Sequence, residues 1–196
     1  KSGIKYTIIS NLSNGEMQTA QIDFNLSELV FLSGDIISIA SQYNFEALEK
    51  DFNIFKDFII PIDKYTFWRH SIQLSSGKQR KLWASTKVGF GSFYSGTRTD
   101  WLVQAGYKVA VPLFIGLESD RRYVTLPDGK FTAQIYRINL NFLFSPNISW
   151  HNFAQYDNQT ETIGWQSRFQ WIIKPGREIF FIWNAPAIDP MERFNP

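Results

Sequence analysis

The chain has 196 residues, of which 44% are hydrophobic and 17% aromatic, and its 20 basic and 18 acidic side chains give a formal net charge of +2. Charged residues make up only 19% of the chain, below the roughly 25% of water-soluble domains, and they form no run that would favour nucleic acid as a partner. The absence of cysteine excludes a disulfide framework and a thiolate metal site, and no apolar stretch approaches the roughly 18 residues of a membrane-spanning helix.

In chain order, the first half predicts four strands. Apolar and polar residues alternate there with the period of two that places successive side chains on opposite faces of a sheet. The expected strands cover residues 4–10, 17–26, 34–45 and 65–74, and a long connection is expected over residues 46–64.

The second half repeats the pattern at residues 80–90, 101–111, 131–144 and 160–173. Over the whole chain, about eleven strands are expected. One face of these strands is apolar and the other carries polar and charged side chains at mid-strand. The apolar set that we predict to face lipid is Tyr136, Ile138, Leu140, Phe142, Trp165, Phe169 and Trp171. The polar set that we predict to line a lumen is Glu118, Asp120, Arg122, Arg137, Gln166, Arg168 and Gln170.

The connections predict how the strands are joined. Tight ones are expected at residues 75–78, 111–113, 145–147 and 174–177, and longer or more polar ones at 91–97, 125–130, 157–161 and from 185 onward. Strict alternation of short turns and long loops around strands of about ten residues is typical of outer-membrane barrels. We therefore predict an all-β chain: one antiparallel up-and-down transmembrane β-barrel segment over residues 1–196. A soluble β-sandwich that buries the same rings is the alternative.

A resemblance supports the barrel prediction. Residues 126–184 carry an acidic-Gly loop, an N-x-x-F-S-P turn, a Q-Y-D-N loop, a G-W-x-x-R-x-x-W strand and a P-G-R turn before an aromatic strand. This pattern resembles the C-terminal barrel domain of unknown function in bacterial envelope proteins that often carry an N-terminal carbohydrate-binding family-nine-like module. Weaker similarity extends back to about Gly34.

The resemblance implies an outer-membrane location, and some members of that family are labelled hydrolases because of the attached module. It also implies a closing strand after the last loop, which this sequence does not show beyond Asn184. We therefore expect the chain to be the C-terminal segment of a longer barrel protein that lacks its final strand.

Two pairs of residues are candidates for catalysis. Glu118 and Asp120 lie two residues apart on one strand face, about 7 Å from the rise per residue, a spacing at which paired carboxylates can process a glycosidic bond. The simpler interpretation is a lumenal network in which they neutralise Arg122, Arg137 and Arg168. His151 and Ser149 also share a face, but no acid stands in sequence to orient them. No catalytic residue is therefore assigned.

These observations predict an outer-membrane anchor or conduit of an envelope protein that is connected with carbohydrate binding or uptake through a fused module. The lipid bilayer is the expected partner, and no metal or other cofactor is expected. Whether the full protein is an enzyme stays open, with the segment itself expected not to be one. The alternatives are a glycoside-processing hydrolase whose chemistry lies mainly in a missing N-terminal module and a soluble carbohydrate-binding β-sandwich.

Overall fold

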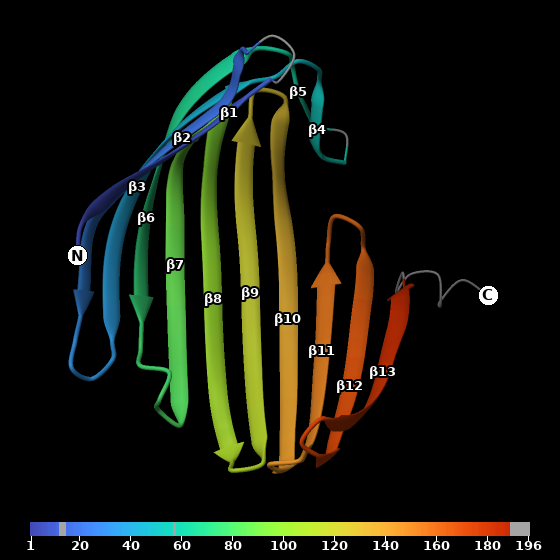
Figure 1. Cartoon of the computed structure of the whole chain (residues 1–196). Helices are drawn as coiled ribbons and strands as arrows, with labels where there is room; N and C mark the ends of the chain where they lie inside the picture. The colour runs from blue at the N-terminus through green and yellow to red at the C-terminus, as the bar shows by residue number, and fades with distance from the viewer. Residues whose placement is uncertain (12–14, 57, 189–196) are drawn as a thin grey trace. The chain divides into compact units, whose positions relative to one another are not determined.

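A computed structural model describes residues 1–11, 15–56 and 58–188, and it is all-β (Figure 1). The described residues hold no apolar helix of membrane-spanning length. Eleven strands form one sheet in the order β1-β2-β3-β6-β7-β8-β9-β10-β11-β12-β13, and β4 and β5 form a separate hairpin. The bounds are β1 Gly3–Ser10, β2 Met17–Val30, β3 Ile36–Ala47, β4 Phe52–Phe55, β5 Phe58–Ile60, β6 Lys64–Ser75, β7 Leu82–Phe93, β8 Gly96–Ala110, β9 Leu113–Leu126, β10 Gly129–Ser145, β11 Ile148–Asp157, β12 Thr162–Lys174 and β13 Arg177–Ile188.

The all-β prediction and the expectation of about eleven antiparallel strands are confirmed. Each strand of the sheet pairs with the next strand along it, so the order is that of an up-and-down meander interrupted only by the β4–β5 hairpin. The period-two pattern located the strands because a sheet with two chemically different faces requires that alternation.

The prediction of strictly alternating short and long connections is wrong. Only two residues join β7 to β8 and β9 to β10, where loops were expected over 91–97 and 125–130, whereas six join β6 to β7, where a tight turn was expected. The backbone adopts positive φ at Tyr94 (48°) in the β7–β8 connection and at Gly129 (143°), the first residue of β10 after the β9–β10 connection. The strands therefore extend into segments that were predicted to be loops because of their glycines. Residues with positive φ allow the chain to reverse in a short turn.

Two further expectations about connections need correction. The long connection over 46–64 contains its own strands, β4 and β5. The segment from Ala185 was expected to be a loop, but β13 continues to Ile188 and pairs there with Ile163 of β12. Residues 189–196 lie outside the described residues. The aromatic and β-branched residues of β13 fit an extended strand.

The chain forms two compact units. Unit 1 comprises Lys1–Gly77, Thr86–Leu102 and Arg121–Ala133, and unit 2 comprises Lys78–Ser85, Val103–Asp120 and Gln134–Pro196. Each unit has a polar sheet face and an apolar sheet face.

The hydrophobic core lies in unit 1, where the β4–β5 hairpin covers part of the polar face of the sheet. Its buried members are Ile60, Phe67, Phe93, Val124 and Leu126. Phe55 of the hairpin stacks on Phe131 with the ring centroids 4.6 Å apart. Aromatic pairs of this kind add about 1 kcal/mol beyond area burial. The hairpin thus converts one part of a polar face into a closed core.

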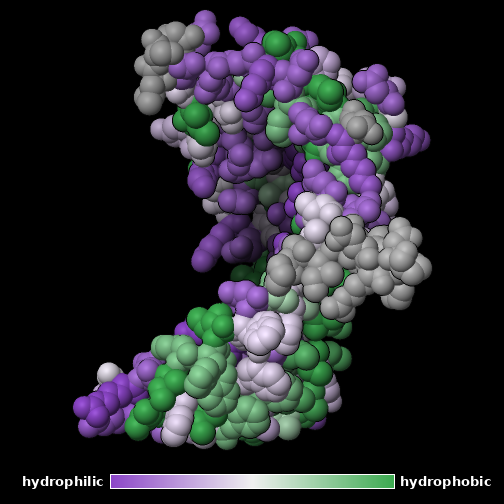
Figure 2. Space-filling model, turned by 90° about the vertical axis from the view of Figure 1, so that its right-hand side faces the viewer, coloured by the Kyte–Doolittle hydropathy of each residue, from purple (hydrophilic) through white to green (hydrophobic). Residues whose placement is uncertain are grey.

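Unit 2 has the opposite distribution of exposure from a water-soluble sheet. Its apolar face carries aromatic and aliphatic side chains that stay open, among them Ile138 (46% exposed), Trp165 (43%) and Trp171 (44%). Figure 2 looks onto the side of β13, where hydrophobic side chains gather around the end of the sheet. Nothing in the described part of the chain packs a second sheet against this face.

Candidate functional site

The predicted lipid-facing residues all lie on one face of unit 2. Residues directly opposite in antiparallel strands project to the same side, and the register pairs Phe142 with Trp150 and Trp150 with Phe169. The same face continues through the pairs of Ile138 with Ala154 and of Ala154 with Trp165. Tyr136, Leu140, Phe142 and Phe169 are half-buried against their neighbours, while Ile138, Trp165 and Trp171 are exposed. The set therefore forms one continuous apolar surface.

The polar face of unit 2 is built in rows across β10, β11 and β12. One row runs from Arg137 through Gln155 to Gly164, and another runs from Asn141 through His151 to Arg168. Gln166 and Gln170 extend the face to β13, where their amides donate to Asn184 at 2.8 Å and to Glu178 at 2.9 Å. The predicted lumenal residues of β10 and β12 thus share one side of the sheet.

Glu118 is the centre of the polar contacts in unit 2. One of its carboxylate oxygens accepts a hydrogen bond from the guanidinium of Arg137, with which it forms an ion pair. The other accepts one from the side-chain amide of Gln104 at 2.7 Å. Arg137 also donates to Gln155 at 2.8 Å. Both oxygens of Glu118 are therefore engaged, which suits a structural network better than acid or base chemistry.

Three predicted lumenal residues remain: Asp120, Arg122 and Arg168. Asp120 and Arg122 follow Glu118 at alternate positions of β9, which places them on the same strand face. Arg168 directs its guanidinium over the ring of Phe180 on β13, 4.6 Å from the ring centroid. Among the residues that the structure describes, it forms no ion pair. The expected neutralisation of Arg168 by Glu118 or Asp120 is thus not found.

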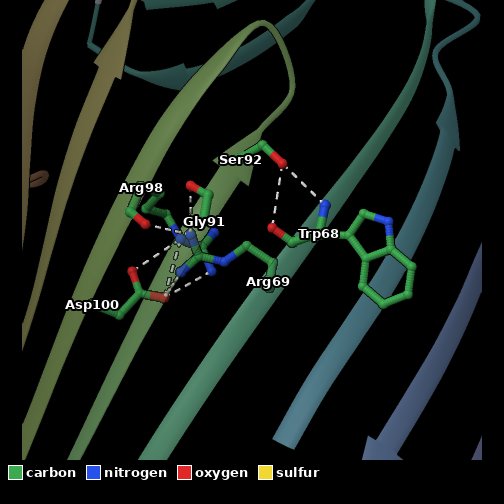
Figure 3. A network of polar contacts seen from close by, with 6 residues as sticks. All are labelled: Trp68, Arg69, Gly91, Ser92, Arg98 and Asp100. Atoms are coloured by element: carbon green, nitrogen blue, oxygen red, sulfur yellow. Dashed lines mark hydrogen bonds and ion pairs between the residues drawn. The ribbon is translucent and has the colours of Figure 1, made fainter.

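A second cluster of charges, in unit 1, was not predicted from the sequence. Arg69 of β6 is 7% exposed and reaches Asp100 of β8 at 2.6 Å. Arg98 donates to the same oxygen, Oδ2, from Nη2 at 3.0 Å and from Nε at 3.2 Å, and its Nε lies 2.9 Å from Oδ1. The guanidinium of Arg69 also donates to the backbone carbonyls of Arg98 and Gly91. Figure 3 shows the two arginines converging on Asp100, while the indole of Trp68 points away from them.

Two glycines of β7 make room for this cluster. A Cβ at Gly91, whose φ is 138°, would lie 2.3 Å from the carbonyl oxygen of Trp68, and a Cβ at Gly89 would lie 3.3 Å from the carboxylate of Asp100. Only glycine tolerates the first position, because of both its conformation and its close approach. The polar mid-strand positions of Arg69 and Asp100, combined with these glycines, were the sequence signal that could have found the site.

The two histidines do not form a catalytic arrangement. His151 Nδ1 lies 3.1 Å from Asn141 Oδ1, not at Ser149. His70 Nδ1 lies 2.9 Å from the hydroxyl of Ser41 on the neighbouring strand, a pair that the sequence analysis did not consider. In the described part of the chain no carboxylate contacts the ring of His70, and the surrounding strand amides are engaged in the ladder that pairs β3 with β6. A dyad without an orienting acid or free oxyanion donors is a poor hydrolase.

The described residues contain no group of three or more His, Cys, Asp or Glu side chains that could hold a metal ion. No family model, no curated protein and no solved structure matches the chain. The resemblance to the C-terminal barrel domain of envelope proteins therefore stays a prediction.

Proposed function

We propose that this chain is a transmembrane β-sheet of the bacterial outer membrane, serving as the anchor or conduit of an envelope protein. Its apolar face is proposed to meet lipid tails, and its polar face to line an aqueous lumen. The observation that carries the proposal is the inverted exposure within each unit. In unit 2 large apolar side chains such as Trp165 and Trp171 are open, and in unit 1 Arg69 is buried with Asp100 while its neighbour Trp68 is exposed.

In water this distribution would be unfavourable, because each exposed aromatic or aliphatic side chain forgoes about 2 kcal/mol of burial. In a bilayer the same surface is transferred into hydrocarbon, and the charges on the polar face remain paired and hydrated. Contiguous exposed apolar surface of this extent is a signature of a membrane or partner-binding face.

A barrel is the finer part of the proposal. β1 and β13 stand at the two ends of the sheet order, each with one neighbouring strand. Hydrocarbon does not tolerate an open strand edge, because its backbone N–H and C=O groups would lack partners. The proposal therefore requires both edges to be paired in the membrane, and a link to carbohydrate through a fused module remains part of it.

The glycoside-processing alternative receives less support. Its best carboxylate, Glu118, is held by Arg137 and Gln104 on both oxygens. A soluble sandwich would require the apolar face to be covered by a second sheet, whereas the second sheet that the structure describes is the short β4–β5 hairpin. That hairpin packs with Phe67 and Phe93, which lie on the polar-face side of the strands.

Quenching of tryptophan fluorescence by lipids brominated in their acyl chains tests the proposal. Of the seven tryptophans, Trp165 and Trp171 lie on the apolar face. Trp83 lies on the polar face, in the space left by Gly106 and beneath Lys78, whose amine is 5.0 Å from the ring centroid. Variants that keep one tryptophan and carry phenylalanine at the others are reconstituted in such lipids.

We expect strong quenching of Trp165 and Trp171 and weak quenching of Trp83, since bromine reaches only side chains in the hydrocarbon. Equal quenching of all three, or quenching of Trp83 alone, would contradict the proposed orientation. A chain that stays soluble without lipid or detergent would contradict the membrane location itself.

A further inference from the structure

Two adjoining grooves in unit 2 are lined in part by its polar face. The first, of about 340 Å³, is lined by Asn139, Asn141, His151, Asn152, Phe153, Gln166 and Arg168. The second, of about 710 Å³, is lined mainly by apolar residues near the β8–β9 turn, and it shares Asn141 and His151 with the first. Both volumes lie in the range of sites for small ligands. The shared residues make the two grooves one continuous surface.

The charge of this surface has a single sign. Arg168 contributes to the first groove and Lys81 and Lys108 to the second, while neither groove is lined by an aspartate or glutamate among the described residues. The ammonium of Lys108 donates to the backbone carbonyls of Lys78 and Gln79, at 3.1 and 3.2 Å, which leaves its charge uncompensated. Glu118, the nearby acid of the polar face, is engaged with Arg137. The surface therefore favours an anion.

The first groove offers donors suited to an anionic head group. Arg168 is exposed, and its contact with Phe180 positions the guanidinium without neutralising it. Asn141 uses its amide oxygen in the contact with His151, which leaves its NH₂ group as a donor. Arg168 and Asn141 flank His151 in one cross-strand row. The guanidinium of Arg168 and the NH₂ group of Asn141 come from different strands, and such a pair of donors suits a carboxylate or phosphate.

The second groove offers an apolar channel that begins where these donors end. Ala110, Val111, Leu113, Phe114 and Leu143 line it. A small inorganic anion would leave these side chains unused, whereas an alkyl chain would bury them together with itself. The combination of an anion-binding end and an apolar end in one surface specifies a ligand with the same two parts.

We propose that the polar face of unit 2 binds a single-chain anionic amphiphile, with its carboxylate or phosphate head between Arg168 and Asn141 and its acyl chain along Ala110, Phe114 and Leu143. This site goes beyond the proposed membrane function and does not depend on it, because every residue involved lies on the face opposite to the apolar surface.

The chain provides its own reporter and control for a binding experiment. It contains two histidines, and His151 belongs to both grooves, whereas His70 lies in unit 1 beside Trp68 and Ser41. The full chain is labelled with ¹³C and ¹⁵N at histidine, held in an uncharged maltoside detergent and titrated while the two imidazole signals are followed by NMR. The probes are octanoate, octyl phosphate, octyl glucoside, acetate and inorganic phosphate.

We expect octanoate, octyl phosphate or both to shift the His151 signal saturably, with His70 unmoved, and the relative affinity of the two identifies the head group. Octyl glucoside should have no effect beyond that of the detergent. Hexanoate should bind about fifteenfold more weakly than octanoate, since it lacks two methylenes and each buried methylene contributes about 0.8 kcal/mol, or about a fourfold change in affinity. Acetate and inorganic phosphate should be weaker still.

Arg168→Gln should weaken octanoate binding at least about tenfold, because a hydrogen bond to a charged group is lost. The matched control is Arg177→Gln, an exposed arginine of unit 2 outside both grooves, which should leave binding unchanged. Asn141→Leu is a second variant with the same expectation as Arg168→Gln.

Equal shifts of His70 and His151, equal binding of octyl glucoside, or unchanged binding in both Arg168→Gln and Asn141→Leu would overturn the proposal. Binding of acetate as tight as that of octanoate would overturn its apolar half. These results are independent of the lipid-quenching experiment: a chain could fail to insert in a bilayer and still bind octanoate, and the converse could also be found.

Discussion

Both units have a polar sheet face, but the two faces differ in how far they are covered. In unit 1 the β4–β5 hairpin and its aromatic core cover part of that face, and Arg69 is almost completely buried with Asp100 and Arg98. In unit 2 the described residues leave the face open, so that Arg168 and Gln166 are exposed and grooves form between the side chains. The difference indicates that charges stabilise the first region, while in the second they remain available to a ligand.

The largest expected effect comes from removing the carboxylate that pairs with the buried Arg69 of unit 1. Asp100→Asn leaves Arg69 buried beside Arg98 without a counter-charge, and breaking a buried pair in this way costs about 3 kcal/mol. The free energy of unfolding in detergent, measured by urea titration, should fall by about that amount. The matched change in unit 2, Glu118→Gln, should cost about 1 kcal/mol, because the side chains of Glu118 and Arg137 are 20% and 30% exposed.

An equal loss of unfolding free energy in Asp100→Asn and Glu118→Gln would contradict this comparison, since it would mean that burial of the polar face does not differ between the units. The double variant Arg69→Leu/Asp100→Leu sharpens it further. It should recover part of the stability lost in Asp100→Asn, because no unpaired charge remains buried.

A charge on the apolar face should be costly in both units. Ile138→Arg in unit 2 and Ile72→Arg in unit 1 each place a guanidinium at a position now 46% and 42% exposed. If both positions contact hydrocarbon, each variant should lose about 2 kcal/mol in lipid vesicles. Asn139→Arg, one residue along β10 on the polar face, is the control and should fold normally. A harmless Ile138→Arg together with a costly Asn139→Arg would reverse the assignment of the faces.

The smallest expected effect concerns a pH dependence confined to unit 1. The side-chain amides of Asn11 and Gln18 donate to the carboxylate of Glu49 at 2.9 and 2.7 Å and lower its pKa. A lowered pKa contributes stability that is present above the ordinary titration range of a glutamate and is lost as the pH falls through the folded-state value. Glu49→Gln should slightly reduce the pH dependence of the heat-unfolding midpoint, which is measured by gel mobility after heating. An unchanged pH profile would mean that another group causes this dependence.

Side-chain alternation predicted the sheet well and the connections poorly. Residues such as Trp165 and Gln166 indicate opposite faces through their chemistry alone, so the eight predicted ranges overlap β1, β2, β3, β6, β7, β8, β10 and β12. The β7–β8 connection was expected to be long because Gly91 resembles a loop residue. In the structure Gly91 lies within a strand, where it admits the backbone of Trp68. A glycine required for close packing and one required for a turn look alike in a sequence.

The candidate site was predictable only in part for a related reason. Arg137 and Glu118 were expected to share the polar face, and they form an ion pair. The sequence could not tell that Arg168 would contact Phe180, or that Asp100 would be held by two arginines from different strands. Period two determines the face of a residue, but the register between strands determines its neighbour.

By itself, therefore, the sequence determined that this chain forms a two-faced antiparallel sheet, because the alternation of polar and apolar side chains is local and survives any pairing of the strands. Only the tertiary structure decided that the apolar face is the open one, that a hairpin seals part of the polar face in unit 1, and that cations without acidic neighbours line a groove in unit 2. Those properties depend on contacts between residues far apart in the chain, which a local pattern does not encode.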